Sequence, residues 1–250
     1  MAHTSLEASI ESILDEFFAR GLITDVLNVV KSGKEATVFR CRAAEASGVP
    51  FFAAKVYRPL TRRSFRNDAV YQDGRPVGDR KRRDRLAFQQ KSRRGREVQF
   101  GDWVAAEFRT LQTLHAAGVD LPRPVARHGP AILMEYVGDD TTAAPVLSHV
   151  TLPPEAARPL FDRLLDNLAR CLSRHCVHAD LSPFNILYWQ GEPKIIDFPQ
   201  AVDPRFNRNA RTLFERDVAN LSRYFERYGV AVEPARLADE LWARYLLGDL

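Results

Sequence analysis

Residues His178 to Asn185 read HADLSPFN, and a second segment, IID from Ile195 to Asp197, follows them. Together they place an aspartate at position 180, an asparagine five positions later, and another aspartate seventeen positions after the first. An aspartate can orient or deprotonate an attacking hydroxyl, while amide and carboxylate oxygens are hard ligands suited to Mg²⁺. This spacing predicts a site that holds nucleotide phosphates and divalent ions, rather than ordinary turn carboxylates beside core strands.

The residues between Asn185 and Asp197 predict a β-hairpin. Apolar runs at 186–188 and 194–196 are typical of short strands, and the sequence WQGEP at 189–193 supplies the turn. A hairpin of this kind would bring Asn185 and Asp197 close together.

Length and composition suit a protein with a substantial core. The chain has 250 residues, of which 45% are hydrophobic, enough for one large domain or two smaller lobes. Its three cysteines lack the spacing of a zinc knuckle, which favours reduced, buried thiols in the cytosol. No run approaches the roughly 18 apolar residues of a membrane span, and the N-terminus lacks a secretory signal pattern, so we expect a cytoplasmic protein without membrane contact.

The first part of the chain predicts a helix and then three strands. Residues 4–20 carry an apolar stripe, with Thr4 and Glu7 at capping-box spacing, and we expect this helix to pack on its own domain rather than bind a partner. The predicted strands are 26–30, 36–40 and 51–57. Lys55 interrupts the apolar run of the third strand, where its ammonium is either edge decoration or a contact for nucleotide phosphates.

Residues 58–96 form a basic segment, rich in arginine and lysine and poor in acids, which we expect to be a long loop. One interpretation is an electrostatic contact with RNA or with an acidic protein. The other is a solvated loop whose charges keep it soluble, and the sequence leaves both open.

The rest of the chain is predicted to be mainly helical. It contains one predicted strand at 132–137, which leads into a hinge near Glu135 to Asp139. Glu107 lies in the first predicted helix of this part. The predicted helices are 102–117, 155–176, 211–228 and 233–247. Strands with one helix followed mainly by helices indicate an α+β arrangement of two lobes.

Several motifs together resemble the RIO kinase family, an atypical group of protein kinases. The loop SGKEA at 32–36 is similar to the family's phosphate loop, HADLSPFNIL at 178–187 to its catalytic segment, and IDFPQAV at 196–202 to its metal segment. The stretch MEYVG at 134–138 and the long basic insertion are similar to the type-1 branch. Lys31 departs from the polar residue that usually starts the loop, and the 53 residues after Asp197 are too few for the substrate-docking elements of ordinary kinases.

The resemblance, which covers roughly residues 24 to 230, implies a two-lobed protein-kinase-like fold. Residues 1–23 would be an N-terminal helix packed on the core. Residues 24–137 would form an N-lobe of antiparallel sheet plus helix, with the ATP loop and the basic insertion. Residues 138–250 would form a compact, mainly helical C-lobe with the catalytic and metal loops.

The same resemblance implies ATP and Mg²⁺ or Mn²⁺ as cofactors and assigns roles to residues. Asp180 would be the catalytic base or would orient the attacking hydroxyl. Asn185 and Asp197 would bind the metal, and Lys55 would contact phosphates and pair with Glu107. Met134 would face the adenine, and Glu135 and Val137 would offer backbone groups to it. The implied ATP-binding residues are Ser32, Gly33, Lys34, Glu35, Val38, Ala53, Lys55, Glu107, Met134, Glu135, Val137, Asn185 and Ile196. Family members are thought to form an aspartyl phosphate, for which Asp197 is the first choice here and Asp180 the second.

The function that follows is RIO-type serine/threonine kinase activity, as autophosphorylation, ATPase turnover or both, with a protein or the chain itself as acceptor. One alternative is an ATPase-gated assembly factor that binds RNA or ribosomal particles through residues 58–96. Another is a small-molecule phosphotransferase, although those enzymes use acidic pockets for cationic substrates. Arginines at 205, 208 and 211 suit such a pocket poorly.

Overall fold

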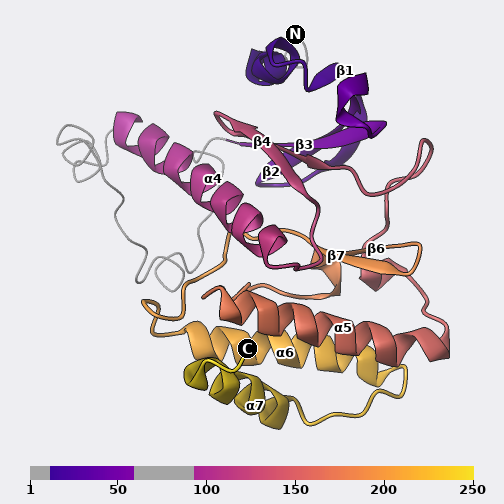
Figure 1. Cartoon of the computed structure of the whole chain (residues 1–250), viewed down its shortest axis with the longest axis vertical. Helices are drawn as coiled ribbons and strands as arrows, with labels where there is room; N and C mark the ends of the chain where they lie inside the picture. Colours follow the sequence, from indigo (N-terminus) through magenta and orange to yellow (C-terminus); the bar gives the residue numbers. More distant parts are fainter. Residues whose placement is uncertain (1–11, 59–92) are drawn as a thin grey trace. The chain divides into compact units, whose positions relative to one another are not determined.

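The computed structural model describes residues 12–58 and 93–250 (Figure 1). These residues form two compact units. The first contains residues 12–58, 93–109 and 123–137, and the second contains residues 110–122 and 138–250. The predicted capping box of Thr4 and Glu7, and most of the basic segment 58–96, lie outside the described residues.

The described part of the first unit holds a five-stranded sheet in which every neighbouring pair is antiparallel, in the order β1-β2-β3-β5-β4. The strands are β1 (Ile23–Ser32), β2 (Ala36–Ala43), β3 (Phe51–Tyr57), β4 (Pro124–His128) and β5 (Ala131–Glu135). The strand predicted at 51–57 is confirmed without change, whereas β1 and β2 extend beyond their predicted ends. A short 3-10 helix, η1 (Glu45–Ser47), lies between β2 and β3.

A helix over residues 12–19 packs on this sheet, as its apolar stripe predicts. Leu14 and Phe17 are fully buried in a cluster that also contains Ile23, Phe39 and Phe52 from the strands. Gly21 follows the helix with φ of +62°, a backbone conformation that glycine adopts without a steric penalty. Removal of these side chains from water stabilises the contact between helix and sheet.

Two predictions in this unit need correction. Helix α4 (Arg93–Ala116) begins nine residues before the predicted start at 102, so residues 93–96 are helical rather than loop. Arginine, glutamate and glutamine are good helix formers, and a helix that is already nucleated extends through them at little cost. Strand β4 was not predicted, because a strand of five residues that starts at a proline carries almost no periodic signal.

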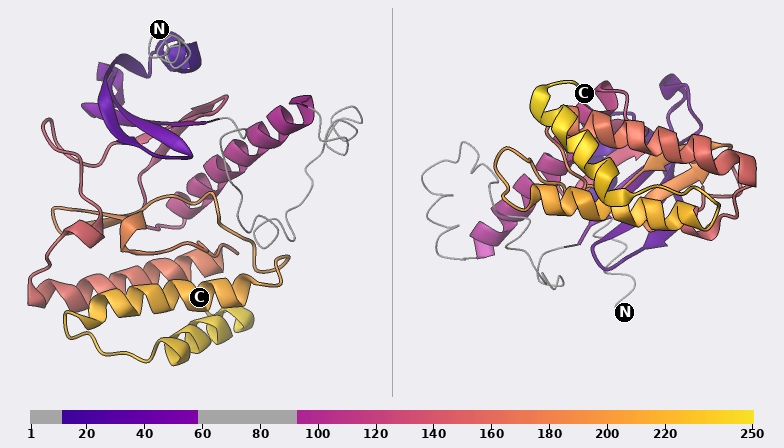
Figure 2. Two further views of the ribbon diagram at one scale, coloured as in Figure 1. Left: turned by 180° about the vertical axis from the view of Figure 1, so that it is seen from behind. Right: turned by 90° about the horizontal axis from the view of Figure 1, so that it is seen from below.

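Three helices, α5 (Pro154–Ser173), α6 (Ala210–Glu226) and α7 (Pro234–Leu247), lie side by side in the second unit (Figure 2). The predicted hairpin is confirmed as β6 (Ile186–Trp189) and β7 (Glu192–Ile195), preceded by the 3-10 helices η3 (Leu147–His149) and η4 (Pro183–Asn185). Helix α5 ends three residues earlier than predicted, because the backbone turns left-handed at His175, with φ of +54°. All three cysteines are buried free thiols, as expected. Among the helices that the structure describes, none has the length and apolarity to cross a membrane.

The longer segment of the second unit, residues 138–250, begins with a tight turn at Gly138, which has φ of +141°. The Asp139 N–H donates to the Thr142 carbonyl at 2.9 Å, and the Asp139 carboxylate accepts from the N–H groups of Thr141 and Thr142. A Cβ at position 138 would lie 2.4 Å from the Thr142 carbonyl oxygen. Only glycine suits this position on both backbone and steric grounds.

We expect Gly138→Ala to lower the free energy of unfolding by about 1–3 kcal/mol, because alanine would be strained at this φ and would collide with backbone. The matched control is Gly101→Ala, at a helical position where an added Cβ meets nothing within 4 Å. That change should raise stability by about 0.5–1 kcal/mol. Urea unfolding measures both, and an equal effect of the two substitutions would contradict this account of the turn.

Candidate active site

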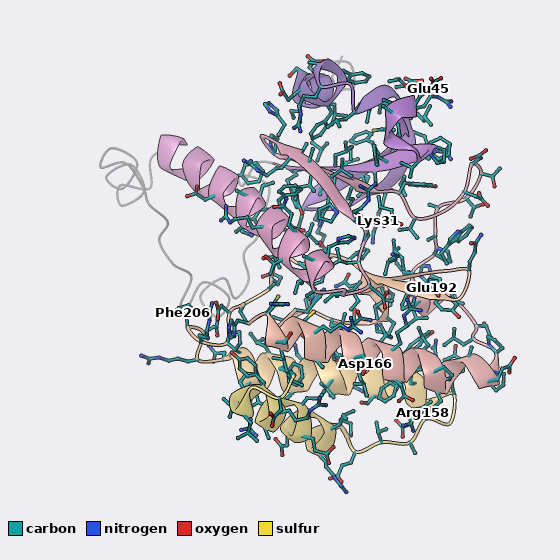
Figure 3. The ribbon with its side chains drawn as sticks, viewed as in Figure 1. Lys31, Glu45, Arg158, Asp166, Glu192 and Phe206 are labelled. Carbon is teal, nitrogen blue, oxygen red and sulfur yellow. The ribbon has the colours of Figure 1, made fainter. Side chains whose placement is uncertain are left out.

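The turn between β1 and β2 contains the residues expected to cradle phosphates. The Gly33 N–H donates to the Ala36 carbonyl at 2.9 Å, which closes a short loop around Lys34, an exposed side chain. The Ser32 hydroxyl accepts a hydrogen bond from the Arg58 guanidinium at 2.8 Å. Figure 3 labels Lys31, the residue that precedes this loop and departs from the family pattern.

Arg58 is a residue that the sequence analysis did not single out. Its guanidinium also donates to the Thr37 hydroxyl at 3.2 Å, and its backbone N–H donates to the Glu35 carbonyl at 2.8 Å. Arg58 thus ties the chain after β3 to the loop between β1 and β2. The sequence did carry one signal for this role of Arg58. The residue comes directly after the predicted strand 51–57, opposite the start of β2.

Lys55 and Glu107 form the expected ion pair, with the ammonium 3.1 Å from the Glu107 carboxylate. The Tyr57 hydroxyl donates to the other carboxylate oxygen, and the Lys55 ammonium lies 4.8 Å from the Tyr57 ring centroid. Trp103 packs edge-on against the same ring. Burial of the Tyr57 hydroxyl, and then the negative charge of Glu107, raise the pKa of Tyr57 well above its usual value, so it remains a donor. The lysine is therefore held in one orientation by a buried carboxylate that has two donors.

The residues expected around adenine lie on neighbouring strands of the same sheet. Val38 of β2 is paired with Lys55, and Ala53 of β3 is paired with Met134 of β5. The Glu135 N–H donates to the Arg123 carbonyl at 2.9 Å. Val137 is the last residue of this unit before Gly138.

Asp180 and Asn185 meet in the second unit, in the loop that leads into β6. The Asn185 amide nitrogen donates to the Asp180 carbonyl at 2.9 Å and lies 3.4 Å from the Asp180 carboxylate. A carbonyl can only accept, so the amide nitrogen must face Asp180 and the amide oxygen is directed elsewhere. The orientation of Asn185 is thus fixed by the backbone of the residue expected to orient the hydroxyl.

The hairpin brings the two ends of the motif together, as the sequence predicts. Ile186 is paired with Ile195, and beyond this pair the Ile196 N–H donates to the Asn185 carbonyl at 2.9 Å. The His178 imidazole lies 3.1 Å from the Ile196 carbonyl. This contact links residues 178–185, the segment expected to be catalytic and called the catalytic loop below, to the strand end that precedes Asp197. Asp197 has φ of +73°, a left-handed conformation that few residues other than glycine, asparagine and aspartate adopt. Such backbone strain is common at functional sites.

Asp217, on α6, holds the catalytic loop and was missed by the sequence analysis. Its fully buried carboxylate accepts from the N–H groups of Ala179 and Leu181, at 2.7 and 2.8 Å. The same helix supplies Arg216, which donates to the Ala179 carbonyl, and Asn220, which donates to the Leu181 carbonyl at 3.0 Å. The two residues on either side of Asp180 are therefore bound to α6 through all four of their backbone polar groups.

A signal for Asp217 was present in the sequence. It lies four positions after Leu213 and four before Leu221, on the apolar stripe of the helix predicted at 211–228. A carboxylate on the buried face of a helix needs donors there, because an unpaired buried charge is strongly unfavourable. The sequence alone does not say which donors meet it.

The electrostatics of the loop follow from these contacts. The protein around the Asp180 carboxyl excludes water and raises its pKa, the Arg216 charge opposes this shift, and the Asp197 charge adds to it. Asp197 therefore acts on Asp180 as a like charge, which is a smaller cause than the exclusion of water and the Arg216 charge. Burial raises the pKa of Asp217 to about 7, against the effect of the two N–H groups that it accepts from.

The donor set suits a hard divalent cation. The amide oxygen of Asn185 and the carboxylate of Asp197 are both oxygen ligands, and they flank one end of the hairpin. Carboxylate and amide oxygens are the ligand chemistry of Mg²⁺ or Mn²⁺ rather than of a thiolate-bound metal. The residues present therefore fit the metal that the motif implies.

The fold is a protein-kinase-like α+β fold. Its sheet carries the Lys55–Glu107 ion pair, and its helical unit carries the loop of Asp180 and Asn185 and the β6–β7 hairpin. The model of the RIO domain family matches residues 37–237. The chain belongs to this family.

Curated relatives agree with the type-1 branch. The chain is 29% identical over 238 residues to human serine/threonine-protein kinase RIO1, which covers 92% of this chain and 39% of the human protein. It is 30% identical over 220 residues to the RIO-type serine/threonine-protein kinase Rio1 of Haloferax volcanii, covering 88% of this chain and 68% of that protein. The match to Rio1 of Thermoplasma acidophilum is 32% identical over 137 residues, 55% of this chain and 70% of that protein. The chain thus spans about two-fifths of the human relative and about two-thirds of the archaeal ones.

We expect Asp217→Asn to destabilise the catalytic loop. The Ala179 and Leu181 N–H groups bind different oxygens of Asp217, and an amide has one oxygen, so its NH₂ group would face one of the two N–H donors. One unpaired buried donor costs about 1–3 kcal/mol. Urea unfolding should show this loss, and amide hydrogen exchange at Ala179 and Leu181 should become faster.

The control is Glu215→Gln on the same helix, which makes the same change in an exposed pair with Arg211. Its effect should stay within about 0.5 kcal/mol. Unchanged exchange at Ala179 and Leu181 in the Asp217 variant would show that the carboxylate does not hold the loop.

Proposed function

We propose that this chain transfers the γ-phosphoryl group of ATP to a serine or threonine hydroxyl, as a RIO-type kinase. The observation that carries the proposal is the loop in which Asn185 binds Asp180. This loop continues into a hairpin that ends at Ile195, two residues before Asp197. The Lys55–Glu107 pair supports it, since a lysine fixed by a buried carboxylate suits a contact with phosphates. Family membership and the names of the relatives favour a serine/threonine kinase over a small-molecule phosphotransferase.

In this proposal Asp180 accepts a hydrogen bond from the acceptor hydroxyl and takes its proton as the oxygen attacks the γ-phosphorus. A new bond forms between that oxygen and phosphorus, the bond between the γ-phosphorus and the bridging oxygen breaks, and ADP leaves. Asn185 and Asp197 hold Mg²⁺, which when bound neutralises negative charge on the phosphates. Little covalent chemistry falls to the protein, and position and charge provide most of the acceleration.

The first unit supplies most of the nucleotide contacts in the proposal, and Ile196 of the second unit adds one to adenine. Lys55 contacts phosphates from the sheet, and Lys34 adds a second positive charge from the loop between β1 and β2. The backbone of that loop, at Ser32, Gly33 and Glu35, surrounds the phosphates. The proposed adenine contacts are Val38, Ala53, Met134, Glu135, Val137 and Ile196.

Asp197 is also the first candidate for a transient aspartyl phosphate, with Asp180 second. The acceptor in a full cycle is then water, a protein side chain or a hydroxyl of the chain itself. Contact of RNA or ribosomal particles with residues 58–96 stays a prediction from sequence.

We expect Asp197→Asn to reduce Mg²⁺-dependent turnover of ATP by about 100- to 1,000-fold, because it removes the anionic ligand of the proposed metal ion that neutralises phosphate charge. The assay uses γ-labelled ATP with purified protein. The matched control is Asp203→Asn, a carboxylate in the same segment that is paired with Arg205. Activity near that of the unsubstituted chain in the Asp197 variant would refute the metal assignment.

We expect Lys55→Met to weaken ATP turnover, because the substitution keeps much of the apolar stem but removes the ammonium beside Glu107. Under the same labelling conditions, turnover should fall while the far-UV circular dichroism spectrum is unchanged. The position of the label then identifies the acceptor: on serine or threonine, on an acid-labile carboxyl group, or in free phosphate. A Lys55 variant with full turnover would remove the lysine from the proposed site.

A further inference from the structure

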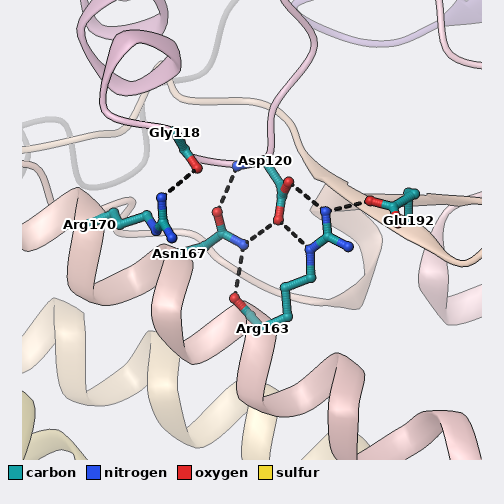
Figure 4. Close-up of polar contacts among 6 residues, drawn as sticks. All are labelled: Gly118, Asp120, Arg163, Asn167, Arg170 and Glu192. Carbon is teal, nitrogen blue, oxygen red and sulfur yellow. Dashed lines mark hydrogen bonds and ion pairs between the residues drawn. The ribbon is translucent and has the colours of Figure 1, made fainter.

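A second polar network lies in the helical unit, apart from the catalytic loop (Figure 4). Its centre is Asp120, in the connection between α4 and β4. The Arg163 guanidinium, from α5, donates to both Asp120 carboxylate oxygens at 2.7 and 2.9 Å. Asn167, which is almost fully buried, donates to the Asp120 carboxylate at 2.8 Å and accepts from the Asp120 N–H at 2.6 Å.

The network continues into the hairpin that bears the proposed metal ligands. The Asp120 carbonyl accepts from the N–H of Ile195, the last residue of β7, at 2.8 Å. The Arg163 guanidinium also pairs with Glu192, the first residue of β7, which Figure 3 labels. Asp120 and Arg163 therefore contact both ends of a four-residue strand.

The N–H, carbonyl and carboxylate of Asp120 are all hydrogen-bonded, so the residue has little freedom to move. Partial burial raises its pKa, but the bonds from Arg163 and Asn167 outweigh this, and the pKa lies below its usual value. Asp120 is therefore ionised at neutral pH. A two-oxygen pairing of arginine with carboxylate fixes both distance and orientation.

The consequence for the site follows from the hairpin register. Ile195, which binds the Asp120 carbonyl, is paired with Ile186, the neighbour of Asn185. Asp197 follows Ile195 by two residues. A shift of β7 would move both proposed ligands, and a metal site tolerates little displacement of its oxygen ligands.

We propose that Asp120 is a positioning residue, which through Ile195 and Arg163 holds the β6–β7 hairpin so that Asn185 and Asp197 face one divalent cation. This inference rests on the proposed function. Asp120 is not one of the proposed metal ligands, and its role is to position them.

The test is a titration of Mn²⁺, followed by electron paramagnetic resonance, in the presence of a non-hydrolysable ATP analogue and the full chain. Asp120→Asn keeps the size of the side chain but loses the ionic pairing with Arg163. Loss of a group that supports metal ligands typically weakens metal affinity by about 10- to 100-fold, and we expect the lower end of that range here. Arg163→Lys, which keeps the charge but not the planar two-bond contact, should weaken Mn²⁺ binding to a smaller extent.

The matched control is Asp162→Asn, which removes an aspartate–arginine pair on α5, the helix that carries Arg163. Asp162 pairs with Arg158, and the two side chains are 50% and 63% exposed. This variant should bind Mn²⁺ as the unsubstituted chain does.

The outcomes separate a positioning role from a structural one. If Asp120→Asn lowers the melting temperature but binds Mn²⁺ normally well below it, the residue is only a structural anchor and the inference is wrong. If Asp120→Asn does not fold, unchanged Mn²⁺ affinity in Arg163→Lys overturns the inference and weakened affinity supports it. If Asp197→Asn binds Mn²⁺ like the unsubstituted chain, the proposed function fails as well.

Discussion

The organisation of the catalytic loop depends on one buried carboxylate, that of Asp217. The backbone around Asp180 leaves the N–H groups of Ala179 and Leu181 directed inward, and Ala179 has a left-handed backbone with φ of +67°. Such a conformation persists only where the surroundings determine it. Asp217 binds both N–H groups from a helix whose apolar face is in the core, so packing of that helix fixes the direction of Asp180.

The hairpin β6–β7 adds the second constraint, since it joins residues that are twelve positions apart in sequence. The antiparallel register sets Asn185 beside Ile196, and the Asn185 amide is then oriented by the Asp180 carbonyl. In the sheet unit, Glu107 plays a comparable part for Lys55, with Tyr57 as a second donor. Both units therefore hold their polar groups in place by hydrogen bonds that involve buried carboxylates or regular backbone pairing.

Features encoded by local patterns were predictable from sequence. The strand 51–57, the hairpin and the helices carry periodic signals, and the motif residues were identified by spacing. Three features were not predictable, because weak propensities and a single backbone angle decide them. They are the start of α4, the short strand β4, and the end of α5 at Ser173, just before the left-handed His175. Asp217, Arg58 and Asp120 were missed because their role lies in partners that are 21 to 75 positions away, such as Ser32, Thr37, Ala179 and Ile195. A sequence pattern shows that a polar residue is on a buried face, but tertiary packing decides what it binds.

The central claim is that Asn185 and Asp197 hold one metal ion beside Asp180 for phosphoryl transfer from ATP. The most direct measurement is a crystal structure of the chain with Mg²⁺ and a non-hydrolysable ATP analogue. We predict a metal ion at about 2.0–2.1 Å from the Asn185 amide oxygen and from an Asp197 carboxylate oxygen. A nucleotide whose metal ion is bound by other residues, with Asn185 and Asp197 uninvolved, would contradict it.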